Sequence, residues 1–333
     1  MKVAINGFGR IGRIVFRLLQ ERKDLTVVAI NDITDNEALA YLLRHDTVLG
    51  HFKGRAEIVD GDLVTDQGTV RMTSERNPRD LPWAEMGVDF VVESTGVFRE
   101  RAQIAQHLEA GAKKVLLTVP AKDEIDATIV LGVNNDDLRP EHQIVSNASC
   151  TTNCLAPMAA VLDREFGITS GQMTTIHAYT GDQRLIDTPH SDWRRARAAA
   201  ENIIPTTTGA ASAVGKVLPK LDGKLDGIAV RVPVPCGSMV DLVTVMDRDI
   251  TAEEVNDAMR AAAESDQMRG IMSYALDPMV SSDVIGDSHS CVFDPDMTAV
   301  SNGNLLKTVG WYDNESGYSS RVCDLLELMA KVG

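Results

Sequence analysis

Two cysteines, Cys150 and Cys154, stand four residues apart in the run SNASCTTNC, and the setting of the first suits nucleophilic chemistry. The run QIVSNAS at 143–149 predicts the end of a strand, and an amphipathic helix is expected to start near Thr151. The sulfur of Cys150 then lies at a helix N-terminus, where partial positive charge favours the nucleophilic thiolate. Cys154, one turn deeper, suits core packing. A redox pair is disfavoured, because an i, i+4 pair within one helix is poorly placed to form a disulfide.

A thiolate nucleophile usually has a base, and His177 is the best candidate among seven histidines. It ends the β-rich run QMTTIHAY in the same half of the chain as Cys150. Taken alone, it would more readily be a structural histidine. Beside a cysteine at the start of a helix and a dinucleotide motif, the role of base becomes the favoured interpretation.

Groups that can bind anions gather around both residues. Hydroxyls, backbone N–H groups at helix starts and arginines all bind phosphate oxygens. The hydroxyl set comprises Ser149, Thr151, Thr152, Thr180 and the run PTTTGAA at 205–211. Arg231 lies inside an otherwise apolar strand, where burying a guanidinium without an anion is costly. Arg194, Arg195 and Arg197 lie in an irregular loop, where each is individually expected to be solvated or at an interface. The sequence therefore predicts one or two anion pockets beside the cysteine.

A second motif lies at the N-terminus. Gly7, Gly9 and Gly12 satisfy G-x-G-x-x-G between a short apolar strand and a helix, and Asp32 follows 20 residues later at the end of the next strand. The glycines allow a tight turn and close approach of a pyrophosphate to the helix N-terminus. The Asp32 carboxylate would accept hydrogen bonds from ribose hydroxyls and repel a 2′-phosphate. The motif therefore predicts NAD rather than NADP.

Two domains are expected to position these residues. Continuous apolar strands alternate with helices over 1–149, which predicts a doubly wound parallel sheet of the Rossmann type. Residues 150–315 predict an α+β domain. Its long β-rich runs DGIAVRVPVP and SMVDLVTVMD, joined by a short turn, indicate neighbouring strands in a largely antiparallel sheet. A final helix at 316–333 could pack on either domain.

Composition narrows the possible partners. The chain of 333 residues has 33 Lys and Arg against 48 Asp and Glu, a net charge of −15, so nucleic acid and anionic membranes are poor partners. Its five cysteines show no CxxC spacing, so no metal site is predicted and free thiols are expected. No signal-peptide pattern or membrane span is evident, and a cytoplasmic protein is expected.

These features together resemble the phosphorylating glyceraldehyde-3-phosphate dehydrogenase family over essentially the whole chain. The similar stretches are INGFGRIGR, SNASCTTNCLAP, RRARAAAENIIPTTTGAA, RVPVP and WYDNESGYSSRV. The resemblance implies NAD-dependent oxidative phosphorylation of glyceraldehyde 3-phosphate to 1,3-bisphosphoglycerate, through a cysteine hemithioacetal and a thioester. It also implies a homotetramer whose last helix returns to the dinucleotide domain.

The resemblance also implies residue roles. Cys150 would be the nucleophile and His177 its base. Thr180 and Arg231 would bind the substrate phosphate. Five further residues would bind the attacking phosphate: Ser149, Thr151, Arg197, Thr208 and Gly209. The cofactor positions would be Gly7, Gly9, Arg10, Ile11, Gly12, Asp32, Arg76, Thr118 and Asn314.

The sequence departs from the family pattern in three places. Gly181 replaces an Asn that contacts the nicotinamide. Thr188 replaces a Leu of NAD-specific members, although Pro189 follows as in those members, so some use of NADP stays open. The run PCGS at 235–238 replaces PNVS, with no effect that the sequence predicts.

Two alternatives remain at this point. Erythrose-4-phosphate dehydrogenase, a sister family, uses the same cysteine and histidine, and LRPEHQIVSNASC is also similar to it. Thr180 and the TTTGAA run fit the phosphorylating enzyme better, since the sister family lacks that threonine and that glycine. The other alternative is a catalytically idle NAD-binding or thiol-sensing protein, in which Cys150→Ser would leave oxidoreductase activity unchanged.

Overall fold

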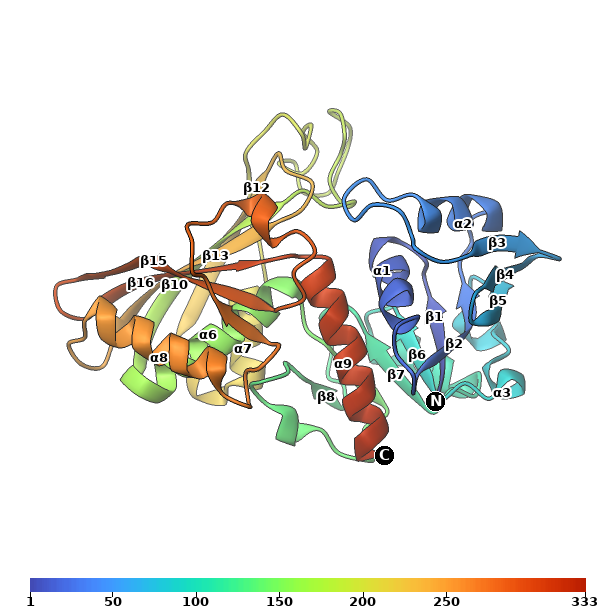
Figure 1. Cartoon of the computed structure of the whole chain (residues 1–333), viewed down its shortest axis with the longest axis horizontal. Helices are drawn as coiled ribbons and strands as arrows, with labels where there is room; N and C mark the ends of the chain where they lie inside the picture. Colours follow the sequence, from blue (N-terminus) through green and yellow to red (C-terminus); the bar gives the residue numbers. More distant parts are fainter. The chain divides into compact units, whose positions relative to one another are not determined.

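The computed structural model describes all 333 residues, which group into two compact units. The first unit comprises residues 1–129, 135–148 and 319–333, and the second comprises 130–134 and 149–318. The last helix, α9 (Ser316–Val332), begins in the second unit, and its residues from Ser319 onward belong to the first (Figure 1).

The first unit is built on a nine-stranded sheet in the order β3-β4-β5-β2-β1-β6-β7-β9-β8. The strands are β1 (Lys2–Asn6), β2 (Thr26–Asn31), β3 (Ala56–Val59), β4 (Asp62–Thr65), β5 (Gly68–Thr73), β6 (Phe90–Glu93), β7 (Lys114–Leu117), β8 (Ala127–Thr128) and β9 (Ile144–Ser146). All neighbours from β5 to β8 pair in parallel, and only β3-β4-β5 is antiparallel. The central strands are buried on both faces, as their continuous apolar runs predict.

Short helices accompany this sheet. They are α1 (Arg10–Leu19), α2 (Asn36–Arg44), α3 (Trp83–Met86), α4 (Arg101–Ile104) and α5 (Gln106–Glu109). Gly12 of α1 has no room for a Cβ, which would lie 2.1 Å from the Gly7 carbonyl oxygen. The third glycine of the motif therefore lets the helix pack closely against the turn.

The second unit contains a seven-stranded sheet in the order β11-β12-β10-β13-β16-β15-β14. The strands are β10 (Ile168–Ala178), β11 (Ile204–Thr207), β12 (Leu225–Val232), β13 (Ser238–Met246), β14 (Met272–Tyr274), β15 (Cys291–Ser301) and β16 (Leu305–Tyr312). Four of the six pairings are antiparallel, and β10-β12 and β14-β15 are parallel. The predicted fold class, a parallel-rich α/β domain followed by a largely antiparallel α+β domain, is confirmed.

One expected pairing is wrong. The runs that form β12 and β13 were predicted to be neighbours, but β10 lies between them and pairs with both. The connection at 233–237 contains two prolines and is longer than a two-residue hairpin turn, so it can cross over an intervening strand.

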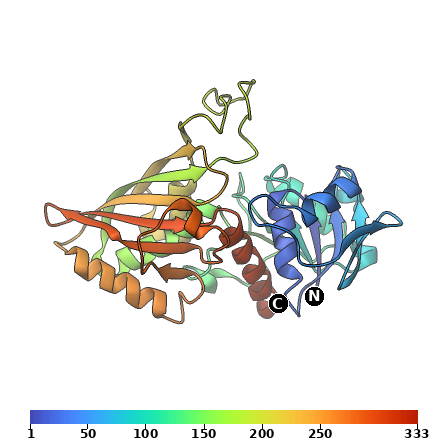
Figure 2. The same ribbon diagram turned by 45° about the horizontal axis from the view of Figure 1, so that its top comes forward.

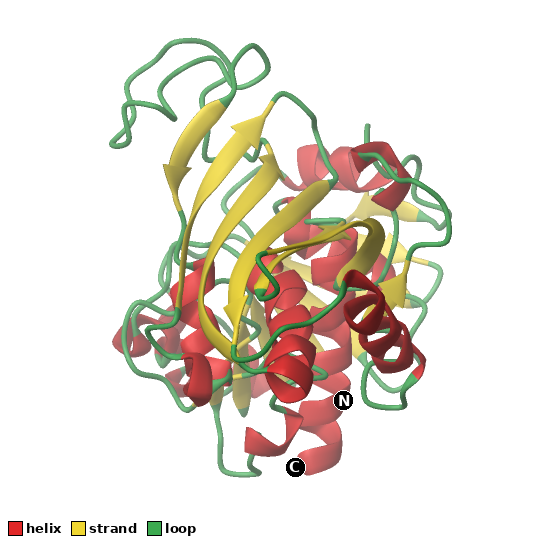
Figure 3. Cartoon of the chain, turned by 90° about the vertical axis from the view of Figure 1, so that its left-hand side faces the viewer, coloured by secondary structure: helices red, strands yellow, loops and turns green.

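Three helices belong to the second unit, namely α6 (Cys150–Phe166), α7 (Ala210–Val217) and α8 (Ala252–Glu264). The predicted apolar face of α6, which includes Leu155, Met158 and Leu162, is fully buried. Both α6 and α8 contact β15, and α7 contacts β12. Figure 3 shows the strands of this sheet in yellow and the helices in red. The segment between β10 and β11 extends away from that sheet as an irregular loop (Figure 2).

None of the helices combines the length and the apolar character that crossing a bilayer requires.

Candidate active site

Cys150 is the first residue of α6, and His177 is the penultimate residue of β10. The Cys150 Sγ lies 3.4 Å from the His177 Nε2. The His177 Nδ1 lies 2.7 Å from the Ala178 carbonyl oxygen, which can only accept a hydrogen bond, so Nδ1 carries the proton. The Nε2 lone pair therefore faces the sulfur and can take its proton.

Ser149 caps the helix on which this sulfur lies. Its Oγ accepts a hydrogen bond from the Thr152 N–H at 3.1 Å, so the chain turns from extended to helical conformation at the residue before Cys150. The predicted place of the cysteine, at the start of a long helix, is what the structure shows. The helix differs from the expected amphipathic one, because all residues from Thr151 to Ala159 are buried.

The ionisation of the pair differs from the expected free thiolate. Burial raises the pKa of the Cys150 thiol, although the Arg231 guanidinium and the Thr151 amide act in the opposite direction. Burial, followed by the charge of Arg231, lowers the pKa of His177 to about 3. Surrounding protein atoms thus disfavour either charge formed alone. Passing the proton from Sγ to Nε2 leaves the total charge of the site unchanged, so thiolate and imidazolium are expected to form together.

Arg231 and Thr180 lie beside the pair. The Arg231 Nη1 donates to the Thr180 Oγ1 at 3.0 Å and to the Ala178 carbonyl at 3.1 Å. These two bonds use both of its hydrogens, so the His177 Nδ1, 3.1 Å away, is a neighbour of this nitrogen and not its acceptor. Burial lowers the pKa of Arg231, and its buried Nε has no hydrogen-bond partner. A buried guanidinium nitrogen without a partner suits an anion.

The structure gives contacts to Asp182, which the sequence did not single out, and to Arg195, which was expected to be solvated or at an interface. The Asp182 carboxylate pairs with Arg195 at 2.6 Å and accepts a hydrogen bond from the Thr180 hydroxyl. Arg195 also donates to the Thr206 Oγ1 at 2.9 Å. Asp182 follows β10 in the irregular loop, and nothing in the sequence indicates that its carboxylate binds both Thr180 and Arg195.

Tyr312 is a second residue that sequence reasoning missed. Its buried hydroxyl lies 2.8 Å from both the Thr151 Oγ1 and the Thr175 Oγ1. Its ring and the His177 ring are in a T-shaped arrangement, with their centroids 6.0 Å apart. Burial raises its pKa well above the usual range. Tyr312 therefore links the first turn of α6 to β10, the two elements that hold the cysteine and the histidine.

The residues predicted to bind the attacking phosphate are only partly assembled. The Thr152 Oγ1 lies 2.7 Å from the Ser149 Oγ and donates to the Ala210 carbonyl at 3.4 Å, so the start of α6 lies beside the start of α7, where Gly209 is the N-cap. Thr208 accepts from the Ala210 N–H at 3.2 Å.

Two of these residues lie in other settings. The Thr151 side chain is turned to the buried Tyr312 hydroxyl, and its backbone N–H is directed to the Cys150 sulfur. The Arg197 guanidinium pairs with Asp187 at 2.9 Å on the exposed loop.

The first unit contains a pocket of about 330 Å³ at the carboxyl ends of β1, β2 and β6. Gly7, Gly9, Asp32 and Arg76, all predicted to contact the cofactor, are among the residues that line it. Gly7 has φ +91°, and a Cβ there would lie 2.7 Å from the Thr95 nitrogen. Gly7 therefore lets the turn pack against the segment after β6. A Cβ on Gly9 would meet nothing within 4 Å, so the bare backbone at this position leaves space in the pocket.

Asp32 is fixed at the rim of this pocket. Its carboxylate accepts hydrogen bonds from the Phe8 N–H at 2.7 Å and the Thr34 N–H at 2.9 Å. These bonds hold the end of β2 against the glycine turn.

The other predicted cofactor residues are distributed over both units. Arg10 pairs with Asp46 at 2.8 Å, and Ile11 follows it in the first turn of α1. Thr118 donates to the Glu93 carbonyl at 3.1 Å beside β6. Asn314 belongs to the second unit, where its Oδ1 accepts from the Ser238 hydroxyl at 2.8 Å.

Cys236, which the sequence left without a role, lies against the segment that carries Asn314. Its thiol donates to the Asp313 Oδ1 at 3.1 Å, and burial followed by the Asp313 charge raises its pKa. Asp313 also accepts hydrogen bonds from the backbone at Glu315 and Ser316, at the start of α9. Cys236 is therefore a protonated donor within this turn.

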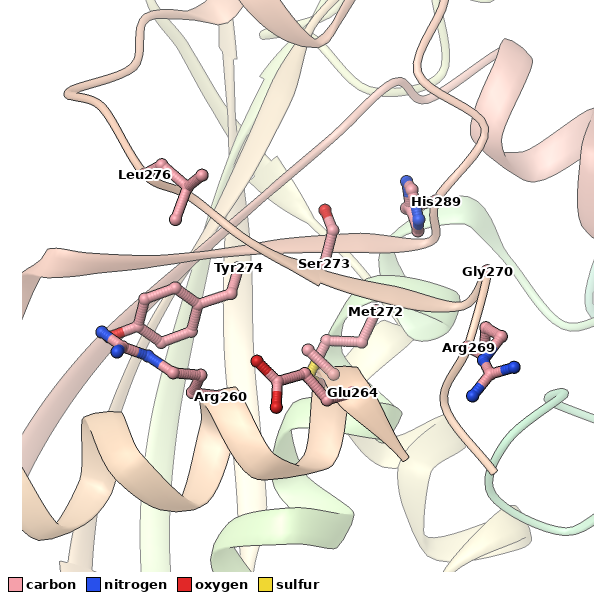
Figure 4. Close-up of a pocket in the computed structure, with 10 residues that line it drawn as sticks. Arg260, Glu264, Arg269, Gly270, Met272, Ser273, Tyr274, Leu276 and His289 are labelled. Atoms are coloured by element: carbon pink, nitrogen blue, oxygen red, sulfur yellow. The ribbon is translucent and has the colours of Figure 1, made fainter. Parts of the chain in front are cut away.

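A surface pocket of about 440 Å³ elsewhere in the second unit contains none of the predicted residues (Figure 4). Arg260 lies over the Tyr274 ring at 4.7 Å, and Arg269 pairs with Asp266 at 2.9 Å. Both of these arginines are therefore already in contact with neighbouring side chains.

Comparison with known proteins decides the family. Residues 149–314 match the family model described as glyceraldehyde 3-phosphate dehydrogenase, C-terminal domain, and residues 1–101 match the NAD binding domain of the same enzyme. The glyceraldehyde-3-phosphate dehydrogenase of Streptomyces coelicolor is 56% identical over 327 residues, covering 98% of this chain and 97% of its own. The chain belongs to the glyceraldehyde-3-phosphate dehydrogenase family.

Two further members of the family are similarly close. The enzyme of Geobacillus stearothermophilus is 54% identical over 334 residues, covering 100% of this chain and 99% of its own. That of Thermotoga maritima is 55% identical over 333 residues, covering 99% of each chain. The resemblance drawn from the cysteine run is confirmed, and so is NAD as the cofactor. The protein is an NAD-dependent oxidoreductase of the aldehyde dehydrogenase type.

Asp32 offers a test of cofactor selectivity. Asp32→Ala should lower the ratio of kcat/KM for NAD to that for NADP at least about ten-fold, because it removes a ribose acceptor and the repulsion of a 2′-phosphate. Steady-state rates with both cofactors measure the ratio. Asp24→Ala, at an exposed carboxylate of the same unit, is the control and should leave the ratio as it is. An unchanged ratio for Asp32→Ala would refute this role.

Proposed function

We propose that the chain oxidises glyceraldehyde 3-phosphate and joins the product to inorganic phosphate, giving 1,3-bisphosphoglycerate. The observation that carries the proposal is the Cys150–His177 contact of 3.4 Å, with the incompletely bonded Arg231 guanidinium beside it. Family membership supports the same reaction, since the relatives described above are glyceraldehyde-3-phosphate dehydrogenases.

The first half of the reaction follows from the Cys150–His177 pair. As His177 Nε2 takes the thiol proton, the Cys150 sulfur attacks the aldehyde carbon and forms a hemithioacetal. The resulting proton on Nε2 neutralises the developing alkoxide, and the N–H of Cys150 at the helix start can donate to that oxygen. His177 then accepts the hydroxyl proton as the carbon is oxidised, which leaves a thioester on Cys150. Bound NAD supplies the hydride acceptor.

The second half uses the thioester. An oxygen of inorganic phosphate attacks the thioester carbon, and the C–S bond breaks to give the acyl phosphate. The departing sulfur of Cys150 recovers its proton from His177. Thr180 and Arg231 are assigned to the substrate phosphate, since their hydroxyl and guanidinium lie next to His177. Ser149, Thr151, Arg197, Thr208 and Gly209 are assigned to the attacking phosphate, supported by the convergence of the α6 and α7 starts.

The cofactor is assigned to the first domain. Residues 1–149 act as the NAD-binding domain, with the terminal helix 316–333 returning to it, and 150–315 act as the catalytic domain. The grouping of 319–333 with the first unit supports this division. The proposed cofactor contacts are Gly7, Gly9, Arg10, Ile11, Gly12, Asp32, Arg76, Thr118 and Asn314.

A homotetramer is part of the proposal. The loop between β10 and β11 exposes large apolar side chains, with Leu185 80% and Trp193 86% exposed, and Ile203 at its end is 69% exposed. Apolar side chains this exposed suit burial against another subunit. The mass of the protein in solution tests this part.

Phosphate dependence tests the proposed reaction. NADH formation from glyceraldehyde 3-phosphate should continue through many turnovers with inorganic phosphate. Without phosphate it should stop after about one equivalent per site, since the thioester has no acceptor. Steady-state and stopped-flow absorbance with NAD, and separately with NADP, measures both phases. Turnover that is indifferent to phosphate would contradict the proposal and would favour release of a simple acid, as expected of the erythrose-4-phosphate enzyme.

A further inference from the structure

A chain of buried hydrogen bonds lies behind the dinucleotide pocket, and its central members do not line that pocket. Glu93, the last residue of β6, and His107, in α5, are both completely buried. Three residues that do line the pocket, Asn6, Asn31 and Thr95, are bonded to Glu93 directly or through one another.

Trp83 fixes the tautomer of His107. The Trp83 Nε1 lies 3.1 Å from the His107 Nδ1, and an indole N–H can only donate. The His107 Nδ1 therefore accepts, and the proton of the neutral ring is on Nε2. That Nε2 lies 3.0 Å from the Glu93 Oε2 and donates to it.

Glu93 receives donors on both oxygens. The Asn6 Nδ2 donates to Oε2 at 2.6 Å, next to the His107 donor. The Thr95 N–H donates to Oε1 at 2.9 Å, and the Thr95 hydroxyl donates to the same oxygen. A carboxylate, which only accepts, satisfies all four donors without contact with water.

The same donor-to-acceptor order continues from Glu93 to the residues at the rim of the pocket. Because Asn6 presents its Nδ2 to Glu93, its Oδ1 faces Asn31, whose Nδ2 donates at 2.7 Å. Asn31 must then present its own Oδ1 to the next segment, where it accepts from the Glu75 N–H at 2.8 Å and the Thr73 Oγ1 at 2.9 Å. Glu75 and the following Arg76 line the pocket. Because Glu93 can only accept, it fixes the orientation of the side-chain amides of Asn6 and Asn31, and through them the position of the loop at 75–76.

We propose that Glu93 and His107 are positioning residues for NAD: the one-way hydrogen-bond chain that ends at Glu93 holds the ends of β1, β2 and β6 and the loop at 75–76 in the geometry that binds the dinucleotide. The inference deepens the proposed function, since it concerns affinity for the cofactor of that reaction. Neither side chain touches the cofactor pocket, so both act through Asn6, Asn31 and Thr95.

Two near-isosteric substitutions separate this role from packing. Glu93→Gln keeps the size of the side chain, but in either orientation its NH₂ group faces donors, from Asn6 and His107 or from the Thr95 amide. We expect the Kd for NAD to rise at least about ten-fold. His107→Gln can accept from Trp83 and donate to Glu93, as the histidine does, so we expect its Kd to stay within about three-fold. His107→Leu supplies neither bond and should raise the Kd about five- to ten-fold.

Titration calorimetry of the full-length protein with NAD alone gives the Kd values. Steady-state kinetics with NAD varied should show a higher KM for NAD and a kcat within about three-fold of wild type. Thermal unfolding identifies any variant that does not fold. If Glu93→Gln does not fold, the comparison of His107→Gln with His107→Leu tests the inference in its place. Wild-type NAD affinity in Glu93→Gln, or equal losses in His107→Gln and His107→Leu, would overturn the inference. Because calorimetry needs no aldehyde, wild-type protein that binds NAD without turnover would count against the proposed function alone.

Discussion

Cys150→Ser is expected to lower kcat for NADH formation at least about 10³-fold. A serine hydroxyl is far less acidic than a thiol, so the neutral His177 imidazole cannot readily take its proton, and an ester is a poorer acyl donor than a thioester. The rate at saturating aldehyde, NAD and phosphate measures the effect. The loss should appear in kcat, while the affinity for NAD in the first domain stays close to that of wild type.

Cys154→Ser is the matched control. Cys154 lies one turn further along α6, is fully buried and contacts the Gly310 carbonyl at 3.6 Å, so its replacement changes core packing but not the nucleophile. Its kcat should remain within about five-fold of wild type, the cost of a mild core change. If Cys150→Ser kept more than a tenth of the wild-type rate, the covalent mechanism would be wrong and a thiol-sensing role would gain support.

His177→Asn should lower kcat about 10²- to 10⁴-fold, the usual contribution of a positioned general base. The substitution removes the side-chain nitrogen that lies 3.4 Å from the sulfur. Alkylation of Cys150 at pH 7 should slow at least about ten-fold, because this partly buried thiol loses the acceptor for its proton. Rates with iodoacetamide across pH measure the change, and unaltered alkylation would show that His177 does not accept that proton.

His177→Asn should also differ from wild type in the pH dependence of its stability. The pKa of His177 is lowered to about 3, below that of an unfolded histidine near 6.5. Between these values the unfolded chain binds the proton and the folded chain does not, so the contribution of His177 to stability is fully present above about pH 6.5 and is lost as the pH falls toward 3. Chemical unfolding should therefore show wild type losing more stability than His177→Asn on acidification from pH 6.5.

The local setting of the nucleophile could be predicted from the sequence. The strand-to-helix change around SNASC placed Cys150 at the start of α6, and the β-rich run before His177 placed the histidine at the end of β10. In both cases the information is contained in one short segment, where periodicity and capping residues determine the structure.

The arrangement of strands and loops could not be predicted in the same way. The insertion of β10 between β12 and β13 depends on strand pairing across more than fifty residues, which apolar periodicity does not encode. Likewise, Asp182 and Arg195 are loop residues in sequence, and only the folded chain brings them together beside Thr180. Tyr312 comes from β16, far along the chain from the helix it supports.

The ionisation of Cys150 and His177 could not be predicted from the sequence either. A helix N-terminus alone favours the thiolate, but the expected effect ignored the burial of Cys150 and His177. Because His177 is buried and Cys150 is partly buried, the charges of the pair depend on each other and on Arg231. The thiolate is therefore better understood as part of an ion pair than as a free anion.

The most direct measurement is the mass of the enzyme after one turnover without phosphate. The NAD-loaded protein is mixed with glyceraldehyde 3-phosphate, quenched in acid, digested and examined by mass spectrometry. The account predicts a 3-phosphoglyceryl thioester on the peptide that carries Cys150, in amounts matching the NADH formed, and its loss on addition of phosphate. Stoichiometric NADH with Cys150 unmodified, or with the acyl group on another cysteine, would contradict it.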